Sequence, residues 1–297
     1  MLRLLTFAVL MFVAPAAVQA QDRLKVIATF SILGDVVKNI GGDRIDMNML
    51  VGPNADAHVY SPSPADAKKL ADAKLVVING LGYEGWIGRL VRASGSKAPV
   101  VTAAKGVNPI RAAGGHGHGH SHDSDPHAWQ SIANVKVYAT NIRDGLIAAD
   151  PAGKAAYEAN AAAYLARLDE LEKEVRDTVA KIPADRRKVI TTHDAFGYFS
   201  AAYGVQFIAP IGAGGNAEPS AKDVAKIIAQ VKRQKIPAVF LENISDQGIM
   251  QQIARETGAK IGGTLYSDAL SNAGGPAATY IDMMRHNVGE LAKALAN

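Results

Sequence analysis

The feature that most constrains this sequence is a long central stretch that lacks helix-breaking residues. Between residues 152 and 182 the only glycine is Gly153, and there is no proline. Apolar residues recur there at steps of three or four, which predicts a helix with one buried stripe. The stripe comprises Tyr157, Ala161, Tyr164, Leu168, Leu171, Val175, Val179 and Ile182. At about 1.5 Å per residue this helix is about 45 Å long, which suits a strut along two lobes. The alternative is a helical hairpin packed on one lobe.

Strand-like and helical segments alternate on both sides of this stretch. Strands are predicted at 25–30, 47–51, 75–80 and 99–103 before it, and at 189–192, 205–210, 238–243 and 260–266 after it. One intervening helix has a clear start, because Ser63 is placed as its N-cap, Pro64 as its first residue and Asp66 as the capping-box partner. Such alternation indicates parallel sheets covered by helices. The sequence therefore predicts an α/β fold of two (βα)4 lobes, with parallel four-stranded sheets, joined by one long rigid backbone helix.

The domain boundaries follow from these patterns. Residues 21–151 are predicted to form an N-terminal lobe, residues 152–182 the linking helix, and residues 183–297 a C-terminal lobe. Within the first lobe, residues 106–126 are rich in glycine and histidine and have no apolar periodicity, so we expect a mobile loop.

The first twenty residues have the pattern of a secretory signal peptide. Arg3 precedes an apolar run at residues 4–13, and small residues at 18–20 form a cleavage signal. The run is short for a membrane span, although a retained anchor is the alternative. The chain has no cysteine, which removes disulfides, thiolate metal sites and lipid attachment at a mature N-terminal cysteine. We therefore expect a periplasmic protein that begins near Gln21, is secreted through a cleavable signal peptide and is not lipid-anchored.

Four metal-binding residue types fall just after predicted strands, where open α/β sheets bind their ligands. His58 follows the second strand, His127 the fourth, His193 the fifth and Asp268 the eighth. A cleft between the lobes would collect two from each side. Three imidazoles and one carboxylate suit tetrahedral Zn²⁺, although copper(II) also binds imidazole tightly. Four protein ligands leave no open position for water, which favours holding zinc over hydrolysis.

Each of these residues also has an ordinary structural interpretation. A lone histidine such as His58 is usually structural or solvated, and Asp268 has the position of a turn residue or helix cap. Asp194 and Glu242 are candidates for orienting the second nitrogen of a ligating histidine, and Glu242 is also a candidate fifth ligand. His286 lies in the middle of a predicted helix and is interpreted as structural.

Taken in order, the motifs resemble the zinc-binding members of the metal-specific solute-binding proteins that serve ABC importers, the cluster A-I family. The resemblance covers nearly the whole mature chain through VGPNADAHVYSPSPAD, DPHAW, ITTHDAFGYFSAAYGV, EPSAKD, VFLEN and LYSDAL. It implies two lobes joined by a rigid helix with metal between them, and it puts His58, His127, His193 and Asp268 on the four ligand positions. It also favours zinc, since manganese-binding relatives carry glutamate where His193 stands.

The function implied by this resemblance is capture of periplasmic Zn²⁺ at high affinity and its delivery to an inner-membrane ABC permease. We expect no enzymatic activity and a monomer, with a periplasmic zinc-donor protein as a further candidate partner. The formal net charge of +4 and the lack of a dense basic run argue against a nucleic-acid partner. The alternatives are a zinc buffer or adhesin without a transporter and a zinc hydrolase in the same cleft.

A second set of histidines alternates with glycine and serine in the predicted loop: His116, His118, His120 and His122. Ordering such a loop around a metal costs about 1–2 kcal/mol per residue, so these residues are predicted to form an accessory site of low affinity. We hypothesise that the loop captures zinc and passes it to the cleft. The alternative is a solvated spacer with no role.

Overall fold

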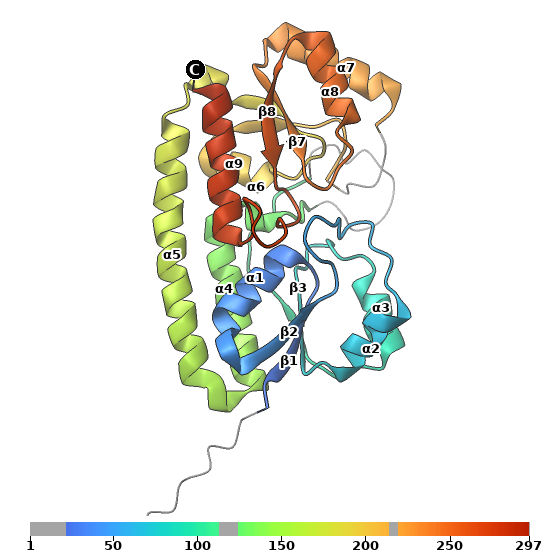
Figure 1. Ribbon diagram of the computed structural model, residues 1–297, viewed down its shortest axis with the longest axis vertical. Helices are drawn as coiled ribbons and strands as arrows, with labels where there is room; N and C mark the ends of the chain where they lie inside the picture. Colours follow the sequence, from blue (N-terminus) through green and yellow to red (C-terminus); the bar gives the residue numbers. More distant parts are fainter. Residues whose placement is uncertain (1–21, 113–123, 214–218, 297) are drawn as a thin grey trace, which may run out of the picture.

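The structure is a computed structural model that describes residues 22–112, 124–213 and 219–296 (Figure 1). The predicted signal peptide lies outside the described residues, as do His116, His118, His120 and His122 and with them most of the predicted loop. None of the helices in the described ranges combines the length and the apolar character that crossing a membrane requires.

The first lobe is built on a parallel sheet with the strand order β2-β1-β3-β4. Figure 1 shows α1 and α4 on one side of this sheet and α2 and α3 on the other. The predicted capping box opens α2, because Ser63 and Asp66 each accept a hydrogen bond from the other's backbone N–H. The elements are β1 (Leu24–Ala28), α1 (Ser31–Gly41), η1 (Gly42–Arg44), β2 (Ile45–Met49), α2 (Pro64–Asp72), β3 (Leu75–Ile78), α3 (Ile87–Ser94), β4 (Val100–Thr102), η2 (Ala128–Gln130) and α4 (Ile132–Ala149).

The second lobe repeats the arrangement with the strand order β6-β5-β7-β8, also parallel. Its last helix starts four residues later than the apolar pattern suggests, because the Thr279 side chain caps it by accepting from the N–H of Asp282. The elements are η4 (Ala184–Arg186), β5 (Lys188–Ile190), α6 (Gly197–Tyr203), β6 (Gln206–Ile208), α7 (Ala221–Gln234), β7 (Ala238–Glu242), α8 (Gly248–Thr257), β8 (Lys260–Leu265) and α9 (Tyr280–Leu295). The predicted fold class is thus confirmed.

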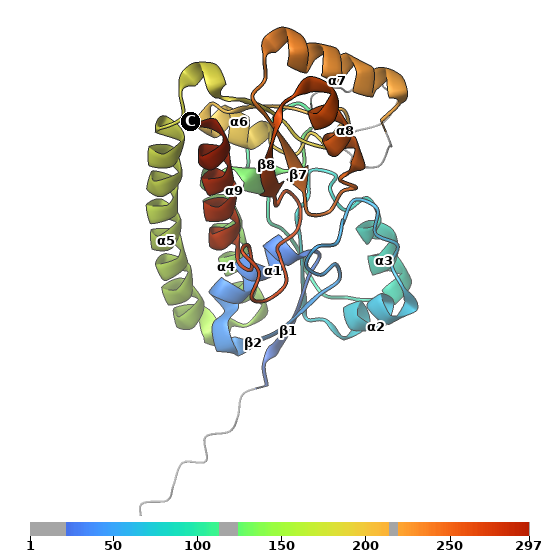
Figure 2. The same ribbon diagram turned by 45° about the horizontal axis from the view of Figure 1, so that its top comes forward.

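The two lobes are joined by α5 (Lys154–Ala180), which follows the short turn η3 (Pro151–Gly153). Figures 1 and 2 show α5 running along both lobes beside α4 and α9. Its buried residues are those of the predicted apolar stripe, and they belong to one core that also includes residues of both lobes. The helix is therefore a strut packed along two lobes and not one arm of a hairpin on a single lobe.

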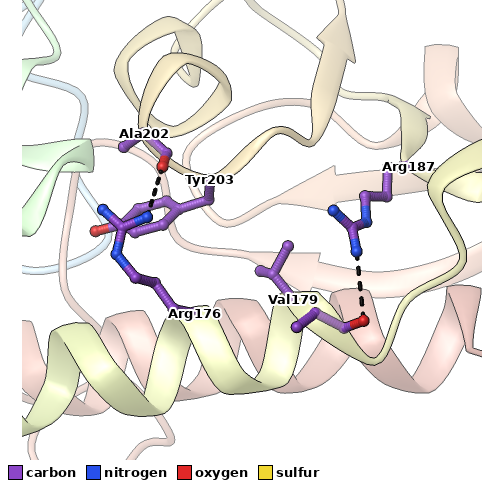
Figure 3. A pocket seen from close by; sticks show the side chains of 6 residues that line it. Arg176, Val179, Arg187, Ala202 and Tyr203 are labelled. Atoms are coloured by element: carbon purple, nitrogen blue, oxygen red, sulfur yellow. Dashed lines mark hydrogen bonds between the residues drawn. The ribbon is translucent and has the colours of Figure 1, made fainter.

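The C-terminal end of α5 is fastened to the second lobe around a cavity of 180 Å³ (Figure 3). Arg176 donates to the carbonyl oxygen of Ala202 at 3.2 Å. Arg187 donates to the carbonyl oxygens of Ile182 at 2.9 Å and Ala180 at 3.4 Å. The last carbonyls of a helix lack partners within the helix and carry partial negative charge, so a guanidinium stabilises them. These contacts hold the end of the strut against α6 and the start of β5.

Candidate metal centre

The four residues that follow predicted strands come together between the lobes. His58 lies in the loop after β2, and His127 precedes the turn η2. His193 follows β5, and Asp268 follows β8. One possible ligand atom from each residue lies within 4.8 Å of the other three. The sheet ends of both lobes therefore supply this cluster, as the topology of parallel sheets leads one to expect.

The distances within the cluster match the size of a small divalent cation. Oδ2 of Asp268 lies 3.1 Å from Nε2 of His58, 3.5 Å from Nε2 of His127 and 3.2 Å from Nε2 of His193. The Nε2 atoms of His58 and His127 are 3.1 Å apart. Around a tetrahedral zinc ion with bonds of about 2.0–2.2 Å, neighbouring ligand atoms are about 3.3–3.6 Å apart. These four separations are close to the tetrahedral value, and all four atoms lie within 4.8 Å of one another, so small shifts of the side chains would bring them to bonding distance from a common centre.

The carboxylate of Asp268 contacts all three imidazoles of the cluster. Its side chain is fully buried, and Oδ1 has no hydrogen-bond partner among the described residues. Oδ2 faces only the three imidazole nitrogens within the cluster. A buried carboxylate oxygen without a partner is costly, and a metal ion would compensate that cost.

The electrostatics of the cluster show how it is balanced without metal. Burial raises the pKa of the Asp268 carboxyl, but the neighbouring His127 and His193 outweigh this and hold that pKa well below its usual range. Burial lowers the pKa of His127, yet Asp268 and Asp125 raise it to about 9. The pKa of His193 is likewise lowered by burial and raised well above its usual value by Glu242 and Asp268. Protons on the imidazoles thus balance the carboxylates, and a cation would replace those protons.

Glu242 contacts the ring of His193 on the side facing away from the cluster and orients it. Its Oε2 lies 2.6 Å from Nδ1 of His193, the ring nitrogen opposite the one in the cluster. Its Oε1 accepts the backbone N–H groups of Thr192 at 2.7 Å and His193 at 3.0 Å. Because the backbone fixes this carboxylate, it holds the ring with Nε2 directed at the cluster. Of the two roles considered for Glu242 from the sequence, the geometry favours orientation over direct ligation.

Asp125 plays the same part for His127, and the sequence reasoning did not identify it. Its Oδ1 accepts the backbone N–H of His127 at 2.8 Å and lies 2.8 Å from Nδ1 of the ring. The signal was present in the sequence Asp-Pro-His, since an aspartate two residues before a ligand can form a turn that accepts that residue's N–H. Asp194, the other candidate, donates its backbone N–H to the carbonyl of Ile211 at 3.0 Å.

The remaining neighbours give the site its walls. The ring of Tyr83 packs edge-on against His58 with centroids 4.6 Å apart, and Trp129 packs against His127 at 5.3 Å. The side chain of His58 is 5% exposed, which makes it the least buried of the four. His286 lies elsewhere, and its Nε2 donates to the carbonyl of Thr264 at 2.9 Å, in keeping with its structural interpretation.

Two parallel-sheet lobes on a rigid helix, with three imidazoles and a carboxylate between them, define the class of metal-binding substrate-binding proteins of ABC transporters. The profile of the family described as "ZnuA: Zinc-uptake complex component A periplasmic" matches residues 26–294. The chain belongs to this family, which is one of solute-binding proteins and not of enzymes.

Known relatives resemble the chain over nearly its whole length. The manganese-binding lipoprotein MntA of Halalkalibacterium halodurans is 36% identical over 277 residues, which are 93% of this chain and 89% of MntA. The manganese ABC transporter substrate-binding lipoprotein PsaA of Streptococcus anginosus is 32% identical over 93% of this chain and 90% of its own. The structure of the periplasmic zinc-binding protein TroA of Treponema pallidum has a TM-score of 0.85 at 29% identity, covering 93% of this chain and all of TroA.

These relatives correct one expectation. The prediction of a protein that is not lipid-anchored is contradicted, because MntA and PsaA are lipoproteins by name. That prediction rested on the absence of cysteine from the printed sequence. Relatives that match nearly the whole of this chain are lipoproteins, so the absence of cysteine does not decide between an anchored and a free form, and the prediction is wrong as it stands.

Proposed function

We propose that this chain captures zinc in the cleft between its lobes and delivers it to the permease of an ABC transporter. The observation that carries the proposal is the convergence of three imidazole Nε2 atoms on one carboxylate oxygen at separations of 3.1–3.5 Å. In this proposal His58, His127, His193 and Asp268 are the ligands, and Asp125 and Glu242 orient two of the rings. We expect the chain to act as a monomer, because each chain supplies all four ligands itself.

The choice of zinc over manganese rests on the chemistry of the donor set. Zinc forms stable tetrahedral sites with imidazole nitrogen, whereas manganese prefers a larger number of oxygen ligands. The cluster offers three nitrogens and one carboxylate. Because the relatives are named for manganese and for zinc alike, kinship alone does not select the metal. The selection of zinc over manganese depends on His193, because a glutamate at this position would make the site richer in oxygen.

The test is a competition between metals on the purified chain and on two variants. We expect the wild-type chain to bind zinc at least about tenfold more tightly than manganese, a difference of about 1.4 kcal/mol. His193→Glu should reduce this ratio, because it exchanges a nitrogen for oxygen ligands. His286→Gln is the matched control, since it changes a histidine outside the cluster, and it should leave the ratio unchanged. Tighter binding of manganese than of zinc by the wild-type chain contradicts the proposal.

Delivery to a permease is tested separately from binding. We expect cells that lack the chain to grow poorly when zinc is scarce, and the wild-type chain to restore growth only if the transporter genes are intact. Asp268→Ala should fail to restore growth, because it removes the only carboxylate of the cluster. Restoration without the transporter would instead indicate a zinc buffer. Cleavage of ester or peptide substrates by the zinc-loaded chain would indicate the hydrolase.

A further inference from the structure

The segment that carries Asp268 belongs to the second lobe in sequence, but it is held by residues of the first. The carbonyl oxygen of Ser267, directly before Asp268, accepts two side-chain hydrogen bonds. The indole Nε1 of Trp129 donates to it at 2.8 Å and the amide Nε2 of Gln130 at 2.7 Å. Both donors come from η2, the short turn that begins immediately after His127.

The backbone beyond Asp268 is held in the same way. The N–H of Leu270 donates to Oγ of Ser31 at 2.9 Å, and its carbonyl accepts the N–H of Asn54 at 2.9 Å. One hydrogen bond connects this segment to the second lobe: Nδ2 of Asn243 donates to the carbonyl of Ala269 at 3.2 Å.

The change of lobe takes place over a single peptide. Tyr266, one residue before Ser267, still belongs to the second lobe, because its N–H and carbonyl both pair with the side chain of Asn287 in α9. Residues 267–270 therefore have most of their polar contacts in the first lobe, next to His127.

Gln130 is a polar side chain that has no evident reason to be buried apart from this contact. It is fully buried, and its Oε1 has no hydrogen-bond partner among the described residues. A buried amide with one unsatisfied atom is less favourable for stability than an apolar side chain of similar size. Its backbone N–H also donates to the carbonyl of His127 at 3.0 Å, so its position is tied to that ligand.

We propose that Gln130 is a positioning residue, which sets the place of Asp268 relative to His127 by holding the carbonyl of Ser267. Trp129 donates to the same carbonyl, and we call the two donors together the clamp on Ser267. One turn of the first lobe thereby provides a nitrogen ligand and fixes the oxygen ligand from the other lobe. The inference rests on the proposed zinc binding, and it adds a residue outside the ligand set and its orienting carboxylates.

The test is a double-mutant cycle with Gln130→Leu, which keeps the volume and removes the donor, and Asp268→Ala. We expect Gln130→Leu to weaken zinc binding by about threefold to tenfold, the worth of one hydrogen bond, and to speed zinc loss to a chelator. In the Asp268→Ala background the same change should have no further effect on zinc affinity, because the ligand that Gln130 positions is gone, although the Ser267 carbonyl remains. The thermal stability of the metal-free protein should not fall.

Asn141→Leu is the matched control. It removes an amide that donates to two backbone carbonyls, of Ala103 and Lys105 at 2.8 Å each, within the first lobe alone. Its zinc affinity should equal that of the wild-type chain. If Gln130→Leu does not fold, Trp129→Phe removes the other donor of the clamp and repeats the test with an aromatic ring in place.

The outcomes separate this inference from the proposed function. Unchanged zinc affinity in Gln130→Leu, or a loss that persists in full in the Asp268→Ala background, overturns the positioning role while zinc binding stands. A wild-type chain that binds no zinc overturns the proposed function and this inference with it.

Discussion

Replacement of Glu242 by glutamine tests whether this carboxylate orients the ring of His193, because it changes only the atom that faces Nδ1 of that ring. Oε1 of Glu242 accepts two backbone N–H groups, from Thr192 and His193. A glutamine must therefore keep its carbonyl oxygen there and turn its NH₂ group toward Nδ1 of His193, 2.6 Å from the present Oε2. A donor at that point requires Nδ1 to accept, which moves the ring proton to Nε2. Nε2 is the atom that must be free for the metal.

The magnitude follows from the role of such orienting groups. Loss of the group that orients a ligating histidine costs about 10–100-fold in metal affinity, or about 1.4–2.7 kcal/mol. A second effect opposes it at neutral pH. Burial lowers the pKa of His193, and Glu242 is the foremost group that raises it, so Glu242→Gln lowers that pKa and reduces competition from protons. We therefore expect the loss of affinity to be larger at pH 9 than at pH 7.

The assay is competition with a fluorescent zinc chelator at both pH values. Glu172→Gln is the matched control, because it removes the same charge from a carboxylate that contacts Tyr203 and Arg176 near the end of α5, away from the cluster. It should bind zinc like the wild-type chain. If Glu242→Gln also binds zinc like the wild-type chain at both pH values, the orienting role of Glu242 is refuted.

Two further predictions concern protonation. The pKa of His127 is about 9 and that of His193 is raised well above its usual value, so zinc binding at pH 7 should release close to two protons. Calorimetry in buffers of different ionisation enthalpy measures this number. Binding without proton release would contradict the prediction. The raised pKa of His127 stabilises the metal-free fold below about pH 6.5, and that contribution is lost as pH rises through about 9; the raised pKa of His193 acts in the same direction. Burial raises the pKa of Asp35 from 3.8 to about 6, so the cost of its charged form grows as pH rises from 3.8 to about 6 and is fully present above that. Asp35→Asn should therefore stabilise the protein at pH 8 by up to about 3 kcal/mol and hardly at pH 4, as measured by urea unfolding. Equal stabilisation at both pH values would show that burial of the charged carboxylate is not the cause.

The architecture was predictable because it depends on repeated local patterns. The apolar steps from Tyr157 to Val179 give the buried face of α5 directly, since a helix of that period has only one such face. The alternation of strands and helices gives parallel sheets. Parallel sheets in turn place residues that follow strands, such as His58 and His193, at the same edge of each lobe.

What the sequence did not reveal depends on contacts between distant segments. The clamp of Trp129 and Gln130 on Ser267 joins residues more than 130 positions apart, and no local pattern marks a backbone carbonyl as a hydrogen-bond acceptor. The role of Glu242 was left open for the same reason, since it depends on the pairing of β5 with β7. Asp125 is different: its signal was local, in the turn before His127, and was missed.

The central claim is that both lobes together hold one zinc ion through three nitrogens and one oxygen. A crystal structure of the zinc-loaded chain, with anomalous scattering measured on both sides of the zinc absorption edge, tests it most directly. We predict one strong site between the lobes, with Nε2 of His58, His127 and His193 and a carboxylate oxygen of Asp268 at about 2.0–2.2 Å from the ion. No zinc between the lobes, or zinc bound there without Asp268, would contradict the account.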